Sequence, residues 1–132
     1  PESLGRLMEA LAAVRAEGAT SVERFIYELR PNLSRYNTLT LITSSFDTSW
    51  VLALSALRRQ GVNVAAILID AGSFGNTLAN QDVPLTALLR NEITSFGVAR
   101  GQDLNLALST PLVWHENTGS SSEHTGSAQV AA

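Results

Sequence analysis

Hydroxyl and carboxylate side chains gather in one short stretch of the sequence. Residues 43–49 read Thr-Ser-Ser-Phe-Asp-Thr-Ser, and Thr20 stands upstream of them in the segment Gly-Ala-Thr. Hydroxyl and carboxylate oxygens are the ligands that hard cations such as Mg²⁺ and Ca²⁺ prefer. Thr20, the loop at 43–49 and the loop that starts at Asp70 and contains Ser73 are therefore candidate cation-binding segments.

The same side chains have a second interpretation, as caps of helices and turns. Thr20, Asp47 and Asp70 all stand where a helix or a turn is expected to begin. Short polar side chains at such positions accept hydrogen bonds from backbone N–H groups that lack another partner. Capping alone accounts for these residue types, so both interpretations stay open.

Residues for covalent or acid–base catalysis are few. The chain has no cysteine, and all nine basic residues are arginine, which excludes thiol chemistry and a catalytic lysine. Ser44 and Ser45 have no histidine near them in the sequence, because His115 and His124 lie in the C-terminal segment. The Gly-Ser-Phe-Gly segment at 72–75 lacks the spacing of a phosphate-binding loop and is typical of a turn. We therefore assign no catalytic residue.

Composition narrows the class of protein further. The 132 residues are 45% hydrophobic and 16% charged, with a net charge of −3, as in a globular domain. A negatively charged chain does not favour nucleic acid as a partner.

No apolar run reaches the roughly 18–20 residues of a membrane helix, so we expect no direct membrane contact. The chain begins at Pro1, which suggests a fragment. We expect a cytoplasmic location, or the cytoplasmic face of a membrane if an anchor lies upstream.

Hydrophobic periodicity predicts alternating helices and strands after two initial helices. The first helix has an apolar stripe with three- and four-residue steps, and Thr20 with Glu23 forms a capping box for the second. We expect Pro31 to stop the second helix. We expect Gly61 to adopt a left-handed conformation that ends the helix at 48–60. The predicted elements are helices at 3–16, 20–30, 48–60, 84–96 and 103–108, and strands at 38–43, 62–69 and 98–100.

This order predicts an α/β fold with a three-layer, parallel, Rossmann-like sheet of about three strands. Residues 1–109 would form part of a domain, and the Ser- and Gly-rich residues 110–132 a disordered polar tail. The strand at 38–43 would lie at the edge of the sheet with an unpaired side. Because such an edge invites pairing, we expect upstream sequence or a second copy of the chain to cover it.

Three segments of the chain resemble a known family. They are Leu39–Val64, which contains Leu-Arg-Arg-Gln-Gly, Ile67–Gly75, which reads Ile-Leu-Ile-Asp-Ala-Gly-Ser-Phe-Gly, and Gly97–Leu104. Together they are similar to the C-terminal half of the bacterial proteins called domain of unknown function 58. Those proteins resemble von Willebrand factor A domains and often accompany MoxR-class AAA ATPases. The resemblance covers roughly residues 4–108.

The resemblance implies a metal-ion-dependent adhesion site built from three loops. The first loop carries Asp-x-Ser-x-Ser, which this chain does not contain. Thr20 matches the threonine of the second loop. Ser44 stands where the third loop usually carries an aspartate, and the nearest carboxylate is Asp47. The resemblance thus narrows the candidate metal ligands to Thr20, Ser44 and Asp47. The resemblance therefore implies no cofactor in this fragment and Mg²⁺ in the full-length protein.

Three functions follow from these observations. The leading hypothesis is a non-enzymatic protein-interaction module that binds a partner's carboxylate at the C-terminal edge of the sheet. The resemblance implies a MoxR-class AAA ATPase as its partner in complex assembly. The first alternative is a Rossmann-like, nucleotide-binding enzyme fragment with its site near residues 43–45 and Asp70. The second is a purely structural piece that forms a homodimer through the strand at 38–43.

Overall fold

Five helices, a 3₁₀ turn and five strands make up the described part of the chain. The computed structural model describes residues 2–115 and 127–130. Within them no helix has the length and apolar content needed to cross a membrane. The elements are α1 (Glu2–Ala13), α2 (Val22–Leu29), the 3₁₀ turn (Arg30–Asn32), β1 (Thr38–Thr43), α3 (Ser49–Arg59), β2 (Asn63–Ile69), α4 (Asp82–Arg90), β3 (Thr94–Val98), α5 (Leu104–Ser109), β4 (Leu112–His115) and β5 (Ser127–Val130).

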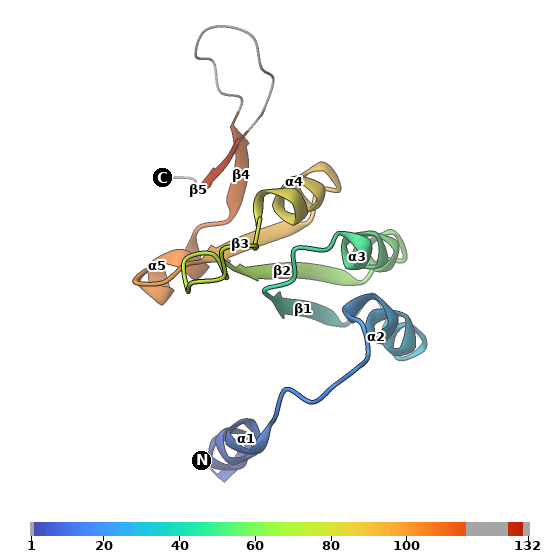
Figure 1. Cartoon of the computed structure of the whole chain (residues 1–132). Coiled ribbons are helices and arrows are strands. Elements are labelled where there is room, and N and C mark those ends of the chain that lie inside the picture. The colour runs from blue at the N-terminus through green and yellow to red at the C-terminus, as the bar shows by residue number, and fades with distance from the viewer. Residues whose placement is uncertain (1, 116–126, 131–132) are drawn as a thin grey trace, which may run out of the picture.

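The three strands β1, β2 and β3 form a parallel sheet in sequential order, with β2 in the centre (Figure 1). Thr38 pairs with Asn63 at the start of β1 and Thr43 with Leu68 at its end, without a bulge between them. The pairing of β2 with β3 starts at Ala65 and Thr94. The predicted fold class, an α/β fold with a parallel sheet of about three strands flanked by helices, is confirmed.

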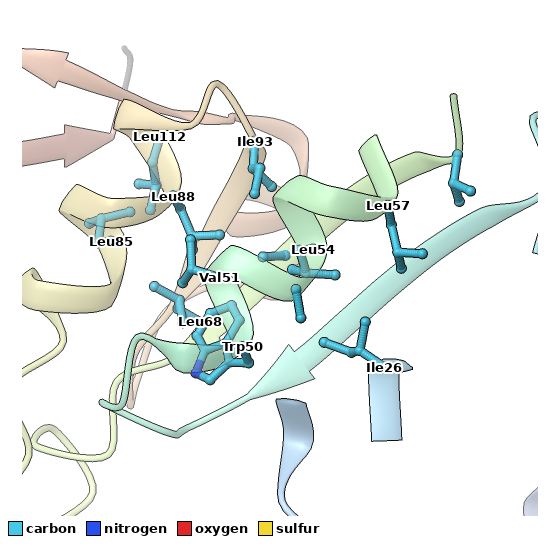
Figure 2. Close-up of a cluster of buried hydrophobic side chains, with 13 residues drawn as sticks. Ile26, Trp50, Val51, Leu54, Leu57, Leu68, Leu85, Leu88, Ile93 and Leu112 are labelled. Carbon is cyan, nitrogen blue, oxygen red and sulfur yellow. The ribbon is translucent and has the colours of Figure 1, made fainter. Parts of the chain in front are cut away.

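One face of the sheet is buried under α2, α3 and α4, which lie in the same order as the strands (Figure 1). Alternate residues of β2, Ala66 and Leu68, point into this core because side chains of a strand alternate between its two faces. Helix α3 is central, and its Trp50 and Leu54 are almost fully buried against the sheet and the neighbouring helices (Figure 2). The apolar residues along α3 therefore hold this helix against the sheet and so position the loop from which the helix starts.

The other face of the sheet is less covered. The register places Ile42 of β1, Ile67 of β2 and Phe96 of β3 in one row across this face. Ile67 and Phe96 are half-buried, whereas the side chain of Ile42 is 61% exposed. Helix α5 contacts β3, at the opposite side of the sheet from β1. The β1 side of this face is therefore open in the part of the chain that the structure describes.

Helix α1 buries none of its residues. The apolar stripe residues within the helix are 55–60% exposed, and Val14 just beyond it is 72% exposed. Figure 1 shows α1 apart from the sheet. The predicted amphipathic helix at 3–16 is present, although it ends at Ala13. The members of the stripe are Leu4, Leu7, Met8, Leu11 and Val14.

The boundary between α4 and β3 differs from the prediction. A helix was expected over 84–96 and a strand over 98–100, because Ile93 and Phe96 continue the spacing of the preceding leucines. The helix instead ends at Arg90, and β3 occupies Thr94–Val98. Glu92 adopts a φ of 54°, and Ile93 N–H then donates to the carbonyl of Leu88 at 3.0 Å, which closes the helix.

Two further predictions need correction. Helix α2 is capped by Ser21, whose side chain accepts a hydrogen bond from Arg24 N–H at 3.2 Å, and Thr20 lies outside the cap. Residues 110–132 were expected to be a disordered tail, but Leu112–His115 and Ser127–Val130 pair as antiparallel strands. Leu112 is buried in the core, which explains why the chain stays ordered here. Residues 116–126, at the centre of the expected tail, lie outside the described residues.

Candidate functional site

The loops that follow the carboxyl ends of the three parallel strands lie at one edge of the sheet. This is the edge where open α/β sheets bind ligands. The first loop is residues 44–48, the second is 70–81, and the third is 99–103.

The loop after β1 is held by its own hydroxyl and carboxylate groups. Thr43 Oγ1 accepts from Ser45 N–H at 3.0 Å, and Ser45 Oγ accepts from Asp47 N–H at 3.3 Å. The Asp47 carboxylate then accepts from Thr48 N–H at 2.7 Å and from Ser49 Oγ at 2.6 Å. Asp47 therefore acts on the first residues of α3, as the capping interpretation expected.

These contacts set the charge of Asp47. The hydrogen bond from the Ser49 hydroxyl, helped by the backbone N–H groups of Ser49 and Thr48, lowers the pKa of the Asp47 carboxyl below its ordinary value. The small desolvation of this exposed group acts in the opposite direction. Asp47 is therefore a carboxylate at neutral pH.

The loop after β2 is joined to the loop after β3. Asp70 N–H donates to the carbonyl of Val98 at 2.8 Å. Ser73 Oγ donates to the carbonyl of Asp70 at 2.7 Å and accepts from Arg100 N–H at 2.9 Å. Gly75 has a φ of +106°, so the segment at 72–75 is the expected turn that needs a glycine. Asp70 and Ser73 therefore have structural roles here.

Gln81 connects the first loop to the second, and sequence reasoning missed it. Its Nε2 donates to the carbonyl of Ser44 at 3.0 Å. A polar residue just before a helix carries no signal of such a long-range contact. Within the described residues, the Oε1 atom of Gln81 and the Nε1 atom of the core residue Trp50 are buried without a hydrogen-bond partner. The loop after β1 is thus tied to Gln81, while one polar atom of Gln81 and one of Trp50 stay without a hydrogen bond.

The three candidate metal ligands are only partly brought together. Ser44 and Asp47 share the loop after β1, while Thr20 lies before α2, and no hydrogen bond among the described residues joins it to either of them. Nor do three His, Asp or Glu side chains converge anywhere in residues 2–115 and 127–130. The metal-binding role of Thr20, Ser44 and Asp47 stays a prediction.

A groove lies between α3 and α4. Its volume is about 640 Å³, and it begins at Thr48 and Asp82, the amino-terminal ends of the two helices. The sequence did not indicate it, because a groove depends on how far apart two helices pack. Its lining residues are Thr48, Val51, Leu52, Asn80, Asp82, Val83, Thr86, Ala87, Arg90 and Asn91.

The groove is lined by exposed apolar side chains together with charged ones. Leu52 and Val83 are 65% and 51% exposed, beside the buried Val51. Asp82 lies in the first turn of α4 and Arg90 in its last turn, so opposite charges stand at the two ends of the groove. Such a surface suits an amphipathic segment with charges of its own.

Comparison with known proteins gives no relative of this chain. No protein-family model, no curated protein and no solved structure matches it. The similarity to the domain of unknown function 58 family therefore stays a prediction that rests on the three sequence segments.

Proposed function

We propose that this chain is a non-enzymatic protein-interaction module that binds a partner polypeptide in the groove between α3 and α4. The observation that supports the proposal is the pair of exposed aliphatic side chains, Leu52 and Val83, which line a groove of about 640 Å³. Burying such side chains against a partner contributes favourable free energy in proportion to the apolar area removed from water.

The charges of the groove define the partner. A basic side chain of the partner pairs with Asp82 at one end, and a carboxylate pairs with Arg90 at the other. Arg90 presents a planar guanidinium, which binds carboxylates with two parallel hydrogen bonds. The partner's carboxylate expected from the sequence is therefore bound by an arginine, with no need for a metal ion.

The family resemblance suggests which partner to try first. Proteins of the domain of unknown function 58 family often accompany MoxR-class AAA ATPases, so we propose an ATPase of that class. Its binding segment would be an amphipathic helix, because the groove lies between two helices and presents the exposed apolar side chains of Leu52 and Val83.

The first experiment titrates the chain with the purified MoxR-class ATPase in a calorimeter. Replacing Leu52 by lysine puts a charge among the apolar side chains of the groove. We therefore expect the Kd to rise at least tenfold, which is about the loss of affinity seen when a central interface residue is removed. The matched control is Leu106→Lys in α5, since Leu106 is 68% exposed and lies outside the groove.

Two results would overturn the proposal. One is an equal Kd for the wild-type chain and Leu52→Lys. The other is an equal loss for Leu52→Lys and Leu106→Lys, which would indicate that any added lysine weakens binding. Circular dichroism on both variants verifies that each is folded.

A further inference from the structure

The outer edge of β1 has none of the features that keep sheet edges from pairing. Among the described strands only β2 pairs with β1. The strand Thr38–Thr43 has no charged residue and no proline, and its register with β2 runs without a bulge. Charges, prolines and bulges are the usual protections of an edge. This edge is therefore ready to accept another strand.

We propose that the strand it accepts is β1 of a second copy of this chain, in antiparallel orientation about a two-fold axis perpendicular to the sheet. The result is a continuous six-stranded sheet. This surface is separate from the α3–α4 groove, so the inference does not depend on the proposed function. The axis makes the contact self-complementary, because each copy offers the same strand.

The side chains of β1 suit pairing with themselves. Leu39 and Leu41 pack against the helix-covered core, whereas Thr38, Thr40 and Ile42 alternate onto the other face. A perpendicular two-fold axis keeps the helix-covered faces of both copies on the same side. With Thr40 at the axis, Leu39 of each copy lies opposite Leu41 of the other, Thr40 lies opposite Thr40, and Thr38 lies opposite Ile42. Cross-strand pairs of these types stabilise antiparallel ladders.

The charges next to β1 favour the antiparallel orientation. Arg35 lies three residues before Thr38, and Asp47 lies four residues after Thr43. Antiparallel pairing brings the start of each strand to the end of the other, so Arg35 of each copy lies near Asp47 of its partner. The contact occurs twice because of the two-fold symmetry. Parallel pairing would instead place Arg35 near Arg35.

Both residues are available for this contact. Arg35 is exposed, and its guanidinium carbon lies 5.0 Å from the ring centre of its neighbour Tyr36, to whose hydroxyl Nη2 donates at 2.9 Å. None of the ion pairs of the described residues involves Arg35. Asp47 is exposed as well. Its carboxylate can accept about four hydrogen bonds, so an arginine can bind without displacing the loop contacts.

The area of the contact predicts its strength. A six-residue ladder buries less than the roughly 800 Å² per partner of a standard interface. The dimer should therefore form in a concentration-dependent manner and weaken with added salt, since it relies in part on exposed charges.

The test is the mass of the full chain by light scattering after gel filtration over a range of concentrations. We expect a rise from 14.1 kDa towards twice that value. Arg35→Glu alone and Asp47→Lys alone each turn two attractive contacts into repulsive ones, and each should weaken association about tenfold or more. An equimolar mixture of the two variants restores both charge pairs, so it should form a one-to-one dimer.

Two controls separate association from folding. Asp47→Asn keeps an oxygen that accepts the loop hydrogen bonds and removes the charge, so it should weaken the dimer without loss of helical signal in circular dichroism. Thr40→Lys, on the exposed face of β1, places two lysines close to the axis and should also give monomers.

The inference is overturned by a constant mass of 14.1 kDa at the highest concentration, or by a mixture of the two charge variants that stays monomeric. Unchanged association in Thr40→Lys would also overturn it. None of these results affects the proposal for the groove. The ATPase titration tests that proposal separately, at a chain concentration too low for the chain to dimerise.

Discussion

Asp47 illustrates how one side chain supports two interpretations that the sequence could not separate. Its position after an apolar strand suggested a metal ligand, and its position before a helix suggested a cap. The structure shows the capping contacts, because the carboxylate accepts from Thr48 and Ser49. The hydroxyls of Thr43 and Ser45 are equally engaged within the loop. Local geometry of this kind depends on backbone angles that residue types alone do not specify.

The contacts of Asp47 predict a pH dependence of stability. The folded-state pKa lies below the ordinary value of 3.8, so the carboxylate stabilises the fold fully above about pH 5. This stabilisation is lost as the pH falls through the folded-state pKa. We expect Asp47→Ala to lower the Tm by a few degrees at pH 7, and the difference from wild type to shrink below about pH 4. A difference that grows on acidification, measured by thermal denaturation, would contradict this assignment.

The two helices that cross between the parallel strands end in the same way. After α3, Gly61 and Val62 donate to the carbonyls of Arg58 and Leu57 at 2.9 and 3.2 Å. After α4, Glu92 and Ile93 make the equivalent bonds to Leu89 and Leu88 at 3.0 Å each. Both ends need a residue with positive φ.

This common ending explains which boundaries the sequence predicted. Gly61 is the residue type that favours positive φ, so the end of α3 and the start of β2 were predicted correctly. Glu92 gives no such signal, and Ile93 and Phe96 continue a helical spacing. The end of α4 and the position of β3 were therefore predicted wrongly. The strands β1 and β2 were predictable because their apolar, β-branched runs are short and bounded by polar residues.

The requirement at Gly61 can be measured. Gly61 has a φ of +90°, and an added Cβ would meet only Arg35 Cβ at 3.6 Å, an ordinary contact. Gly61→Ala should therefore destabilise the fold through backbone strain alone, by about 1 kcal/mol. Gly5→Ala in α1 is the control, because an added Cβ there meets nothing within 4 Å. Equal unfolding free energies for Gly61→Ala and wild type in urea would show that the strain is absent.

At the scale of the chain, stability is concentrated between the sheet and α2, α3 and α4. The core cluster draws its buried residues from these elements, together with Val62, Ile93 and Leu112, and includes none from α1. An isolated helix of this length is marginally stable in water. The sequence predicted the amphipathic stripe of α1 correctly, but it could not show that the stripe lacks a packing partner within the described chain.

Two leucine-to-alanine variants test this division. Leu54→Ala in α3 removes a side chain that is 0% exposed and should cost about 2–5 kcal/mol of unfolding free energy. Leu11→Ala in α1 removes a side chain that is 60% exposed and should change it by less than about 0.5 kcal/mol. Chemical denaturation provides both values. A loss above 1 kcal/mol for Leu11→Ala would mean that α1 packs against the core in solution.

The sequential order of the strands has a consequence for how the protein is made. Thr38 pairs with Asn63 and Ala65 pairs with Thr94, so each strand joins the one synthesised next, after a single helix. The sheet can therefore grow one strand at a time as the polypeptide leaves the ribosome. Because β1 is synthesised before β2 and β3 and pairs only with β2 among the described strands, its other edge stays unpaired while this sheet forms.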